Sequence, residues 1–309
     1  MSLNSHSLNK GPFDALITSN KKIGERFYRI SLVFEGKGGT AFAKTSAGQF
    51  AELDLSTTAL PPLDTISENL RDTAERKILL RRPFSFCDVT TKSGKTLVEI
   101  LYCVVGPASL RMTTLSKGDS ISVTGPLGNG FSVPKNKKIA LLATGGMGAG
   151  PLIHLAKTLK QNYPDIKVTA FVGAKTAKEL PFEKIRKSEP TDFARYNVKS
   201  IISTDDGSMG VRGLVTYCLT EWLDENKSAA KDIIIYSCGP EMMLARMAEI
   251  AQKYNVDCQI SMERMMACGI GVCQSCAVEC KVSGSRETVY KLCCKDGPVF
   301  DSREVVFEL

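Results

Sequence analysis

Histidine is almost absent from this sequence, which contains only His6 and His154. Two histidines cannot build a multi-histidine zinc centre, so thiolates must supply any metal site. Long hydrophobic runs are absent too, because no stretch reaches the roughly 18 apolar residues of a membrane span. The polar opening MSLNSHSLNK also lacks the apolar core of a signal peptide. We therefore expect no membrane partner and a cytoplasmic protein.

The sequence also lacks a long run of basic residues. Its formal net charge is +7, yet 40 Lys and Arg residues are interspersed with 33 Asp and Glu residues. Nucleic-acid-binding segments typically show basic clusters, often interleaved with aromatic residues. The charge pattern predicts no nucleic-acid partner and favours a solvated surface that attracts an acidic protein.

Cysteine, in contrast, is abundant and unevenly placed. Seven of the eleven cysteines lie between residues 258 and 294. Small secreted proteins use many cysteines as disulfides, but this chain is large and its cysteines are crowded together. The distribution indicates a thiolate metal site in a reducing compartment.

Three regions follow one another along the 309 residues, which are too many for one average domain. Residues 1–136 contain short strands separated by turns, which predicts an antiparallel β-barrel with residues 54–80 as a long inserted loop. Strands alternate with helices in residues 137–255, which predicts a doubly wound parallel α/β sheet with its ligand at the carboxyl ends of the strands. Residues 256–309 predict a small domain that depends on metal for its order. The expected fold class is therefore α+β with several domains.

The segment CGIGVCQSC carries the most specific motif. Its spacing, Cys-x4-Cys-x2-Cys with a further cysteine 18 residues later, is that of plant-type two-iron two-sulfur (2Fe-2S) proteins. Gly269 and Gly271 would let the backbone wrap closely around the inorganic sulfides. A structural zinc site and simple buried thiols remain alternatives. The candidate metal ligands are Cys268, Cys273, Cys276 and Cys294.

A glycine-rich loop follows the first strand expected in the α/β region. It contains Gly145, Gly146 and Gly148 ahead of a helix, and such a loop lets a pyrophosphate approach the amides of the helix N-terminus. Later, Cys238, Gly239 and Pro240 follow another strand, so both loops should lie at the same edge of the sheet. The alternative is that the glycines form a tight turn between a strand and a helix and bind no ligand.

The motif RRPFS lies in the barrel region, ahead of GPLGNGF. Arg82 and Ser85 could bind a flavin diphosphate, while Phe84, next to Pro83, lines the flavin ring system. A strand end without a ligand is the alternative interpretation of the same residues.

Seven motifs occur in order from residue 81 to residue 300: RRPFS, GPLGNGF, GGMGAGP, TDDGSMG, YSCGPEMM, CGIGVCQSC and CKDGPVF. In this order the chain resembles the electron-transfer subunits of type B dihydroorotate dehydrogenases, within the wider ferredoxin-NADP reductase-like superfamily. The resemblance implies an FAD-binding barrel, a domain that binds NAD(H) and a 2Fe-2S domain. It also implies that the RRPFS residues bind FAD, that the two loops bind the nucleotide and that the four cysteines bind the cluster.

One motif departs from the pattern of this family. The second flavin motif usually has the form Gly-x-Gly-Thr, but here Gly106 is followed by Pro107, Ala108 and Ser109. By position, Gly106, Ala108 and Ser109 are still expected to contact the flavin. Residues 54–80 are also longer than the family leads one to expect.

The resemblance further implies an oxidoreductase subunit of pyrimidine biosynthesis that works in a hetero-oligomer. Electrons from dihydroorotate would pass through the flavin of a catalytic subunit to the cluster, then to FAD and finally to NAD. Cys238 is expected to act at the nicotinamide. A paralogous reductase subunit that serves a hydrogenase or ferredoxin, and a non-catalytic redox sensor, are the alternatives. Lys175 and Lys178 leave NAD and NADP both open.

Cys280, Cys293 and Cys294 compete for the fourth ligand position. Adjacent residues of an extended chain point to opposite sides, so only one of Cys293 and Cys294 can reach the iron. The family cysteine precedes its DGPVF-type segment by one intervening residue, which favours Cys294.

Overall fold

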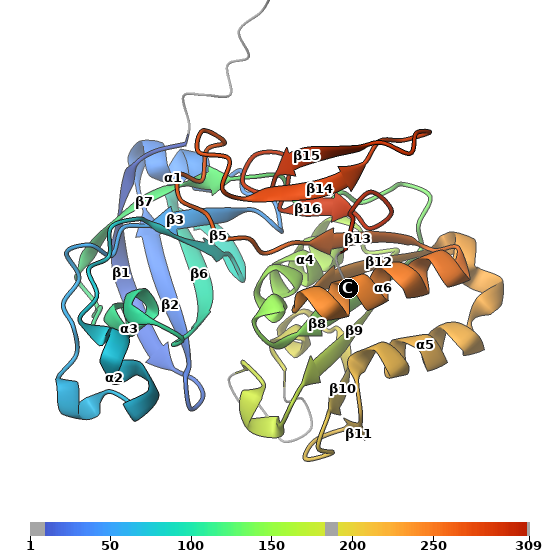
Figure 1. The fold of residues 1–309 in the computed structure, drawn as a ribbon, viewed down its shortest axis with the longest axis horizontal. Coiled ribbons are helices and arrows are strands. Elements are labelled where there is room, and N and C mark those ends of the chain that lie inside the picture. Colours follow the sequence, from blue (N-terminus) through green and yellow to red (C-terminus); the bar gives the residue numbers. More distant parts are fainter. Residues whose placement is uncertain (1–9, 183–190, 308–309) are drawn as a thin grey trace, which may run out of the picture.

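Most of the first half of the chain forms one antiparallel sheet in the computed structural model, which describes residues 10–182 and 191–307. Its seven strands curl into a half-barrel, on the left of Figure 1, in the order β4-β3-β7-β1-β2-β6-β5. Ile30, Leu32 and Phe34 point into the barrel core because alternate residues of a strand face the same side. The expected antiparallel barrel is thus confirmed. Its strands are β1 (Phe13–Lys22), β2 (Phe27–Phe34), β3 (Phe50–Leu53), β4 (Arg82–Ser85), β5 (Asp88–Lys92), β6 (Lys95–Cys103) and β7 (Ser120–Leu127).

Three short helices accompany the barrel. They are α1 (Gly36–Phe42), α2 (Glu68–Ala74) and α3 (Pro107–Met112). The inserted loop 54–80 contains α2, which packs on α3 through a small cluster of Ile66, Ala74 and Leu110. The insertion therefore has a core of its own beside the turn that follows β6.

The second half of the chain forms a mainly parallel sheet, on the right of Figure 1. Its order is β11-β10-β9-β8-β12-β13-β16, and only the β13–β16 pair is antiparallel. The first strand in sequence, β8, lies in the middle, between β9 and β12, which is the arrangement of doubly wound folds. The strands are β8 (Ile139–Gly145), β9 (Lys167–Ala174), β10 (Lys199–Thr204), β11 (Val211–Arg212), β12 (Ile233–Cys238), β13 (Asp257–Ser261) and β16 (Val299–Asp301).

Helices cover both faces of this sheet. On one face Leu142 packs against Leu152 of α4, and on the other Leu141 packs in the core that contains Met247 of α6. The alternation of neighbouring strand residues between two cores confirms the doubly wound architecture. The helices are α4 (Ala149–Asn162), α5 (Val215–Glu225) and α6 (Glu241–Tyr254). The 3-10 turns are η2 (Leu63–Thr65), η3 (Gly146–Gly148), η4 (Ala177–Glu179), η5 (Asp192–Tyr196) and η6 (Lys227–Asp232).

The cysteine-rich segment leaves the sheet and returns to it. Strand β13 lies beside β12, the chain then makes a long loop and the hairpin of β14 (Ala277–Lys281) and β15 (Thr288–Leu292), and β16 pairs with β13. The hairpin lies at the top of Figure 1, in red. The sheet therefore draws two strands from beyond residue 255, where the expected nucleotide-binding domain ended.

Hydrogen bonds from the backbone and the side chain of Asn129 attach this C-terminal segment to the barrel. The Asn129 amide donates to the carbonyl oxygen of Gly297 at 2.6 Å, and its side-chain Nδ2 donates to Lys295 and Asp296 carbonyl oxygens at 3.1 and 3.0 Å. The cysteine loop is consequently held against the barrel and the parallel sheet together.

Candidate active site and cluster loop

The carboxyl ends of β8 and β12 form the floor of a cleft. The chain leaves β8 towards α4 on one face of the sheet and leaves β12 towards α6 on the other face. Such a switch point opens a crevice between the two loops, and ligands of doubly wound folds bind there. The loops are those that the glycine motifs predicted, and both line a cleft of about 460 Å³.

Glycines allow these two loops to touch. A Cβ atom on Gly148 would lie 2.0 Å from the carbonyl oxygen of Cys238, and one on Gly145 would lie 2.9 Å from Met243 Sδ. Gly146 has a φ of +53°, a conformation that glycine adopts at little cost. The first turn of α4 contains no acidic residue, so its amides can attract an anion. Gly145, Gly146, Gly148, Gly239 and Pro240 all line the cleft.

The barrel forms the opposite wall of the cleft. Pro83, Phe84 and Ser85 line it from β4, and Tyr102 lines it from the neighbouring β6. Phe84 meets Tyr102 edge to face, with ring centroids 6.5 Å apart. An apolar wall of aromatic rings facing glycine-rich backbone suits a planar ring system with a phosphate tail.

Arg82 lies at the start of β4, outside the cleft lining. Its Nη1 donates to the carbonyl oxygens of Leu80 at 2.8 Å and Arg81 at 3.1 Å. The neighbouring Arg81 contacts other segments of the barrel instead. It donates to Ser122 O and Oγ at 3.0 and 3.1 Å and pairs with Asp54 at 3.3 Å. Arg81 thus holds strands together. Within the described residues the hydrogen bonds of Arg82 go only to the nearby carbonyl oxygens of Leu80 and Arg81, and its charge also acts on Glu52.

Gly106, Ala108 and Ser109 form the start of α3 and do not line the cleft. The Ser109 hydroxyl accepts the amides of Val105 at 3.0 Å and Gly106 at 3.2 Å. It therefore caps its own turn, and only Val105 of this segment reaches the cleft. A flavin contact by these three residues remains a prediction.

Cys238 ends β12 and lines the cleft. Burial raises the pKa of its thiol to about 12, although a hydrogen bond with Ser261 opposes this. The thiol is consequently protonated at neutral pH and adds no charge to the cleft.

A third wall comes from a segment that the sequence did not indicate as part of this site. Ser261, Met262, Glu263, Arg264 and Met266 line the cleft between β13 and the cysteine loop. Arg264 donates to both carboxylate oxygens of Glu241 in α6, at 2.8 and 3.0 Å, which fixes this wall to the nucleotide loop. No local motif marks these residues, because they reach the cleft through the pairing of β13 with β12.

The cysteine loop begins directly after this wall. Cys268 Sγ accepts the amides of Val272 at 3.3 Å and Cys273 at 3.4 Å. Hydrogen bonds from Ser275 and from Cys268 lower the pKa of the Cys273 thiol to about 6, and a thiolate is the form that binds metal. Amide donors aimed at sulfur are typical of iron–sulfur sites.

The other two candidate ligands lie together. The Cys294 amide donates to Cys276 Sγ at 3.4 Å, and the Cys294 thiol interacts with those of Cys276 and Cys268. Within the described residues no three His, Cys, Asp or Glu side chains converge on one point as for a single ion. The thiols instead lie in two pairs, Cys268 with Cys273 and Cys276 with Cys294. A two-iron cluster takes two ligands at each iron, so this donor set fits it.

The competing cysteines point elsewhere. Cys293 is fully buried and its Sγ donates to the carbonyl oxygen of Met262 at 3.4 Å. Cys280 is buried in β14, near Lys291 and Glu304. Cys280 therefore lies away from the two thiol pairs. Cys293 lies near Cys276, but its thiol donates to a backbone carbonyl instead of joining a thiol pair, which favours Cys294 as the fourth ligand.

Glu52 lies beneath the cysteine loop. It is 1% exposed, and its Oε1 has no hydrogen-bond partner within the described residues. Burial raises the pKa of this carboxyl, although Arg81 opposes the shift. A Cβ atom on Gly269 would lie 2.5 Å from Glu52 Cδ, so only glycine fits at this position of the loop.

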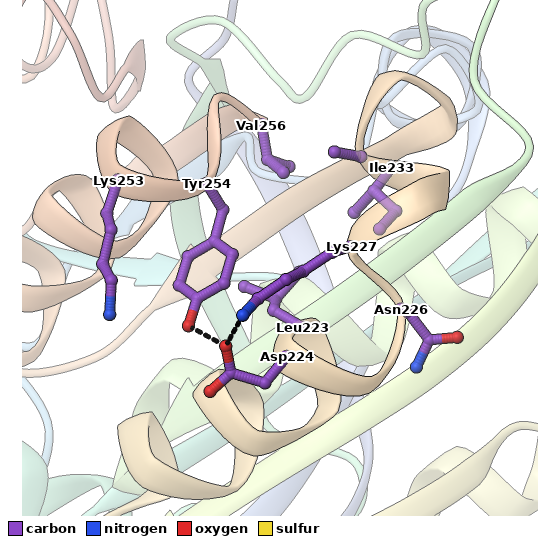
Figure 2. Close-up of a pocket in the computed structure, with 9 residues that line it drawn as sticks. Leu223, Asp224, Asn226, Lys227, Ile233, Lys253, Tyr254 and Val256 are labelled. Carbon is purple, nitrogen blue, oxygen red and sulfur yellow. Dashed lines mark hydrogen bonds and ion pairs between the residues drawn. The ribbon is translucent and has the colours of Figure 1, made fainter.

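Another pocket, of about 300 Å³, lies at the opposite end of the parallel sheet. Figure 2 shows Asp224 between Tyr254, whose hydroxyl donates to it at 2.7 Å, and Lys227, paired with it at 2.9 Å. These polar groups satisfy one another. The pocket also lies at the amino end of β12, near Ile233, away from the glycine loops.

Comparison with known proteins finds relatives that match nearly the whole chain. A family model described as the iron-sulfur cluster binding domain of dihydroorotate dehydrogenase B matches residues 263–306. A protein of Caldanaerobacter subterraneus subsp. tengcongensis, named "Dihydroorotate dehydrogenase B (NAD(+)), electron transfer subunit", is 34% identical over 95% of this chain and 98% of its own. A protein of Geobacillus kaustophilus with the same name is 34% identical over 94% of this chain and 96% of its own.

A solved structure agrees with these relatives. It is titled "Insights into flavin-based electron bifurcation via the NADH-dependent reduced ferredoxin-NADP oxidoreductase structure". The TM-score is 0.71 and the identity 26%, over 94% of this chain and 89% of that chain. In residues 10–182 and 191–307 no helix has both the length and the apolar character that crossing a membrane requires. The fold, the cleft and the relatives agree, and the chain belongs to the family of dihydroorotate dehydrogenase B electron transfer subunits.

Proposed function

We propose that this chain is the electron-transfer subunit of a dihydroorotate dehydrogenase that uses NAD, and that it binds FAD and a 2Fe-2S cluster. One observation carries the proposal: a single cleft is bounded by the RRPFS strand, by the two glycine loops and by the wall that leads into Cys268. A flavin bound there would lie between a nicotinamide and the cluster. When bound, FAD converts the two-electron chemistry of a nicotinamide into the one-electron chemistry of a cluster.

The proposed roles follow the walls of the cleft. The β4 wall, from Pro83 to Ser85, lines the flavin ring, and Arg82 turns from its own backbone to the flavin diphosphate. The glycine loops bind the nucleotide, and the neutral thiol of Cys238 faces the nicotinamide. The two thiol pairs hold the cluster. Gly106, Ala108 and Ser109 support the flavin site from the start of α3.

A separate catalytic subunit supplies the electrons. The named relatives are electron transfer subunits of an enzyme that acts on dihydroorotate, and we propose the same partner here, in a hetero-oligomer of pyrimidine biosynthesis. The thiolate ligands require a reducing compartment, which supports a cytoplasmic location. The alternative is a paralogous reductase subunit that serves ferredoxin, and the 26% identity to a ferredoxin-NADP oxidoreductase favours it as the second candidate.

The bound cofactors test the assignment of the barrel. Protein purified without oxygen should release one FAD per chain on denaturation and contain two irons per chain. Arg82→Ala should lose more flavin than Arg81→Ala, because the hydrogen bonds of Arg82 within the described residues are to nearby carbonyl oxygens and leave it able to turn to a diphosphate. Arg81→Ala is the matched control, since it removes contacts with Ser122 and Asp54 that stabilise the barrel. Release of FMN, or equal flavin losses in the two variants, would contradict this assignment.

A further inference from the structure

The barrel and the nucleotide-binding sheet meet along a band where β5 and β6 face α4 and η5. Part of the contact is apolar, because Cys87 and Leu101 of the barrel side are buried in the same core as Leu152 and Leu155 of α4. Apolar contacts of this kind hold two surfaces together without specifying one alignment, since they are not directional.

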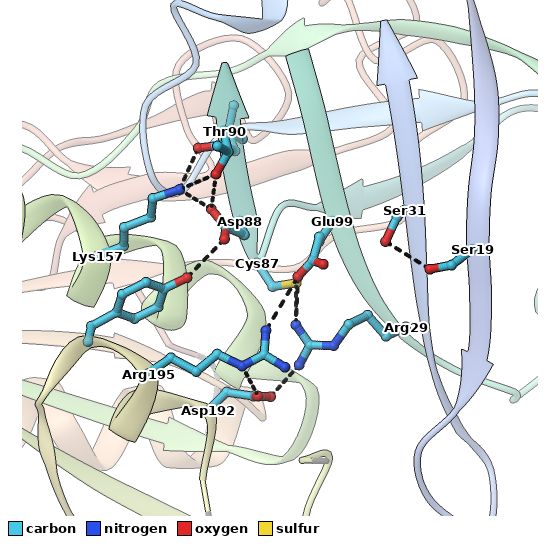
Figure 3. A network of polar contacts seen from close by, with 12 residues as sticks. Ser19, Arg29, Ser31, Cys87, Asp88, Thr90, Glu99, Lys157, Asp192 and Arg195 are labelled. Carbon is cyan, nitrogen blue, oxygen red and sulfur yellow. Dashed lines mark hydrogen bonds and ion pairs between the residues drawn. The ribbon is translucent and has the colours of Figure 1, made fainter. Parts of the chain in front are cut away.

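Ion pairs cross the same band, as Figure 3 shows. Arg29 of β2 pairs with Asp192 of η5, and Asp88 of β5 pairs with Lys157 of α4. Glu99 of β6 lies 3.6 Å from Arg195 of η5. The barrel thus contributes one cation and two anions to these pairs, and the nucleotide side contributes two cations and one anion. We call these six residues the interdomain network.

Bonds within each side make the network continuous. Arg29 Nη1 donates to Glu99 Oε2 at 2.9 Å, and Arg195 Nε lies 3.0 Å from Asp192 Oδ1. Arg29, Asp192, Arg195 and Glu99 therefore form a closed ring of alternating charge. Lys157 Nζ also donates to the Val89 carbonyl oxygen at 2.7 Å.

The centre of this ring is shielded from water. The Arg29 side chain is 5% exposed and that of Asp192 is fully buried. A buried ion pair is tolerated only while the geometry is good, because either charge left without its partner is strongly unfavourable. Such a pair resists sliding of one surface over the other, whereas apolar packing permits it.

The network lies directly behind the cleft, on the same elements. Glu99 precedes Leu101, a cleft residue of β6, by two residues, which is about 7 Å along a strand. Lys157 follows Pro151, a cleft residue of α4, by six residues, which is about 9 Å along a helix. Movement at the network is therefore transmitted to both walls of the cleft through rigid elements.

We propose that the interdomain network is a positioning device that aligns the flavin wall of the barrel with the nucleotide loops. The proposal rests on the function proposed above, in which a hydride passes from reduced FAD to NAD+. The reverse direction is the one measured below, and in it NADH and FAD become NAD+ and FADH−. Hydride transfer requires the two rings in close contact, and its rate depends steeply on their alignment. None of the six residues lines the cleft, so they act on its walls through β6 and α4.

Three substitutions each remove one crossing charge and nearly keep the side-chain size: Asp192→Asn, Glu99→Gln and Lys157→Met. Each variant is mixed with NADH without oxygen, and the limiting rate of flavin reduction is measured. The long-wavelength charge-transfer absorbance of nicotinamide stacked on flavin is recorded in the same mixture. FAD and iron per chain report folding. The control is Glu249→Gln, which breaks an exposed ion pair with Arg246 within α6.

We expect the limiting rate to fall at least tenfold in Asp192→Asn, with weaker charge-transfer absorbance and with FAD and iron per chain unchanged. Glu249→Gln should match the parent. If the three variants lose thermal stability but keep the parent's rate and charge-transfer absorbance, the network is only structural and the proposal is overturned. If Asp192→Asn loses its flavin, the rates and charge-transfer absorbances of Glu99→Gln and Lys157→Met, whose side chains are less buried, test the proposal in its place. A parent protein that NADH does not reduce would instead contradict the proposed function.

Discussion

At the scale of single residues, the thiols of the adjacent Cys293 and Cys294 have different partners. Cys293 points to the carbonyl of Met262 in the core, whereas Cys294 lies beside Cys276 in the cysteine loop. The extended chain expected from the sequence is not present here, because β15 ends at Leu292 and both cysteines lie in the turn that follows it. The turn, rather than strand alternation, gives the two thiols different partners. The sequence left Cys293 and Cys294 as an adjacent pair, and the position of the family cysteine ahead of its DGPVF-type segment favoured Cys294. The direction of each thiol depends on how the segment packs against Met262, which no local pattern predicts.

Cys294→Ser should therefore remove the cluster or shift its visible absorption and electron-spin signal, because serine offers a weaker oxygen ligand. Cys293→Ser and Cys280→Ser should retain both signals, and they serve as matched controls. Spectra of the three proteins, purified without oxygen, provide the test. Loss of the cluster in Cys293→Ser with retention in Cys294→Ser would show that the assignment is wrong by one residue.

His154 is a buried histidine that binds nothing in the proposed scheme. It is 4% exposed, and its Nδ1 has no hydrogen-bond partner in the part of the chain that the structure describes. Burial lowers the pKa of the imidazole to about 4, and nearby Lys157 adds to this while Asp88 opposes it. In the unfolded chain the imidazole of His154 has a pKa near 6.5. Below that pH the unfolded chain therefore binds a proton at His154, whereas the imidazole of the folded chain stays neutral until the pH approaches 4.

Folding stability should consequently fall as the pH is lowered from 7.5 to 5.0, by about 2 kcal/mol from this residue alone. His154→Leu removes the titrating group and should lose less stability than the parent over this range. Urea unfolding at both pH values measures the difference. Parallel losses in the parent and the variant would mean that His154 takes up its proton equally well in the folded chain.

At the scale of elements, the nucleotide site depends on two loops that touch. A side chain at residue 148 would overlap the backbone of Cys238, at 2.0 Å from its carbonyl oxygen. Gly150 differs, because a Cβ atom there would meet nothing within 4 Å. Both glycines belong to one motif, but only at residue 148 does the neighbouring backbone leave no room for a side chain.

Gly148→Ala should force the loops apart, lower the midpoint of thermal unfolding and weaken NADH binding about tenfold or more. Gly150→Ala is the control for stability, because alanine favours the helix by roughly 0.5–1 kcal/mol over glycine. Calorimetry and NADH titration of both variants measure these effects. Unchanged stability and NADH affinity in Gly148→Ala would argue against the close approach of the two loops.

The elements also show what the sequence could predict. The cysteine spacing, the glycine loops and the strand–helix alternation are local patterns, and the predicted barrel and doubly wound sheet are confirmed by the structure. Strand β16 has only three residues, Val299–Asp301, too few for a pattern. Its return to the sheet, and the cleft wall from Ser261 to Met266, arise from contacts between distant segments. The Arg29–Asp192 pair spans 163 residues and has no local signal at all.

At the scale of the whole molecule, three regions converge on one cleft. The barrel supplies an apolar wall, the parallel sheet supplies glycine loops, and the C-terminal segment closes the cleft and continues into the cysteine loop. Hydrogen bonds from Asn129 hold that segment against the barrel. This arrangement supports a relay through one chain, with oxidation of dihydroorotate assigned to a partner.

The most direct measurement follows the relay in the isolated chain. NADH is added without oxygen, and the flavin absorbance and the electron-spin signal of the reduced cluster are recorded. Dihydroorotate is then tested as the donor, first alone and then with the catalytic subunit. We expect NADH to reduce both flavin and cluster in the single chain, and dihydroorotate to reduce them only with the partner present. Failure of NADH to reduce the flavin, or reduction by dihydroorotate without the partner, would contradict this relay.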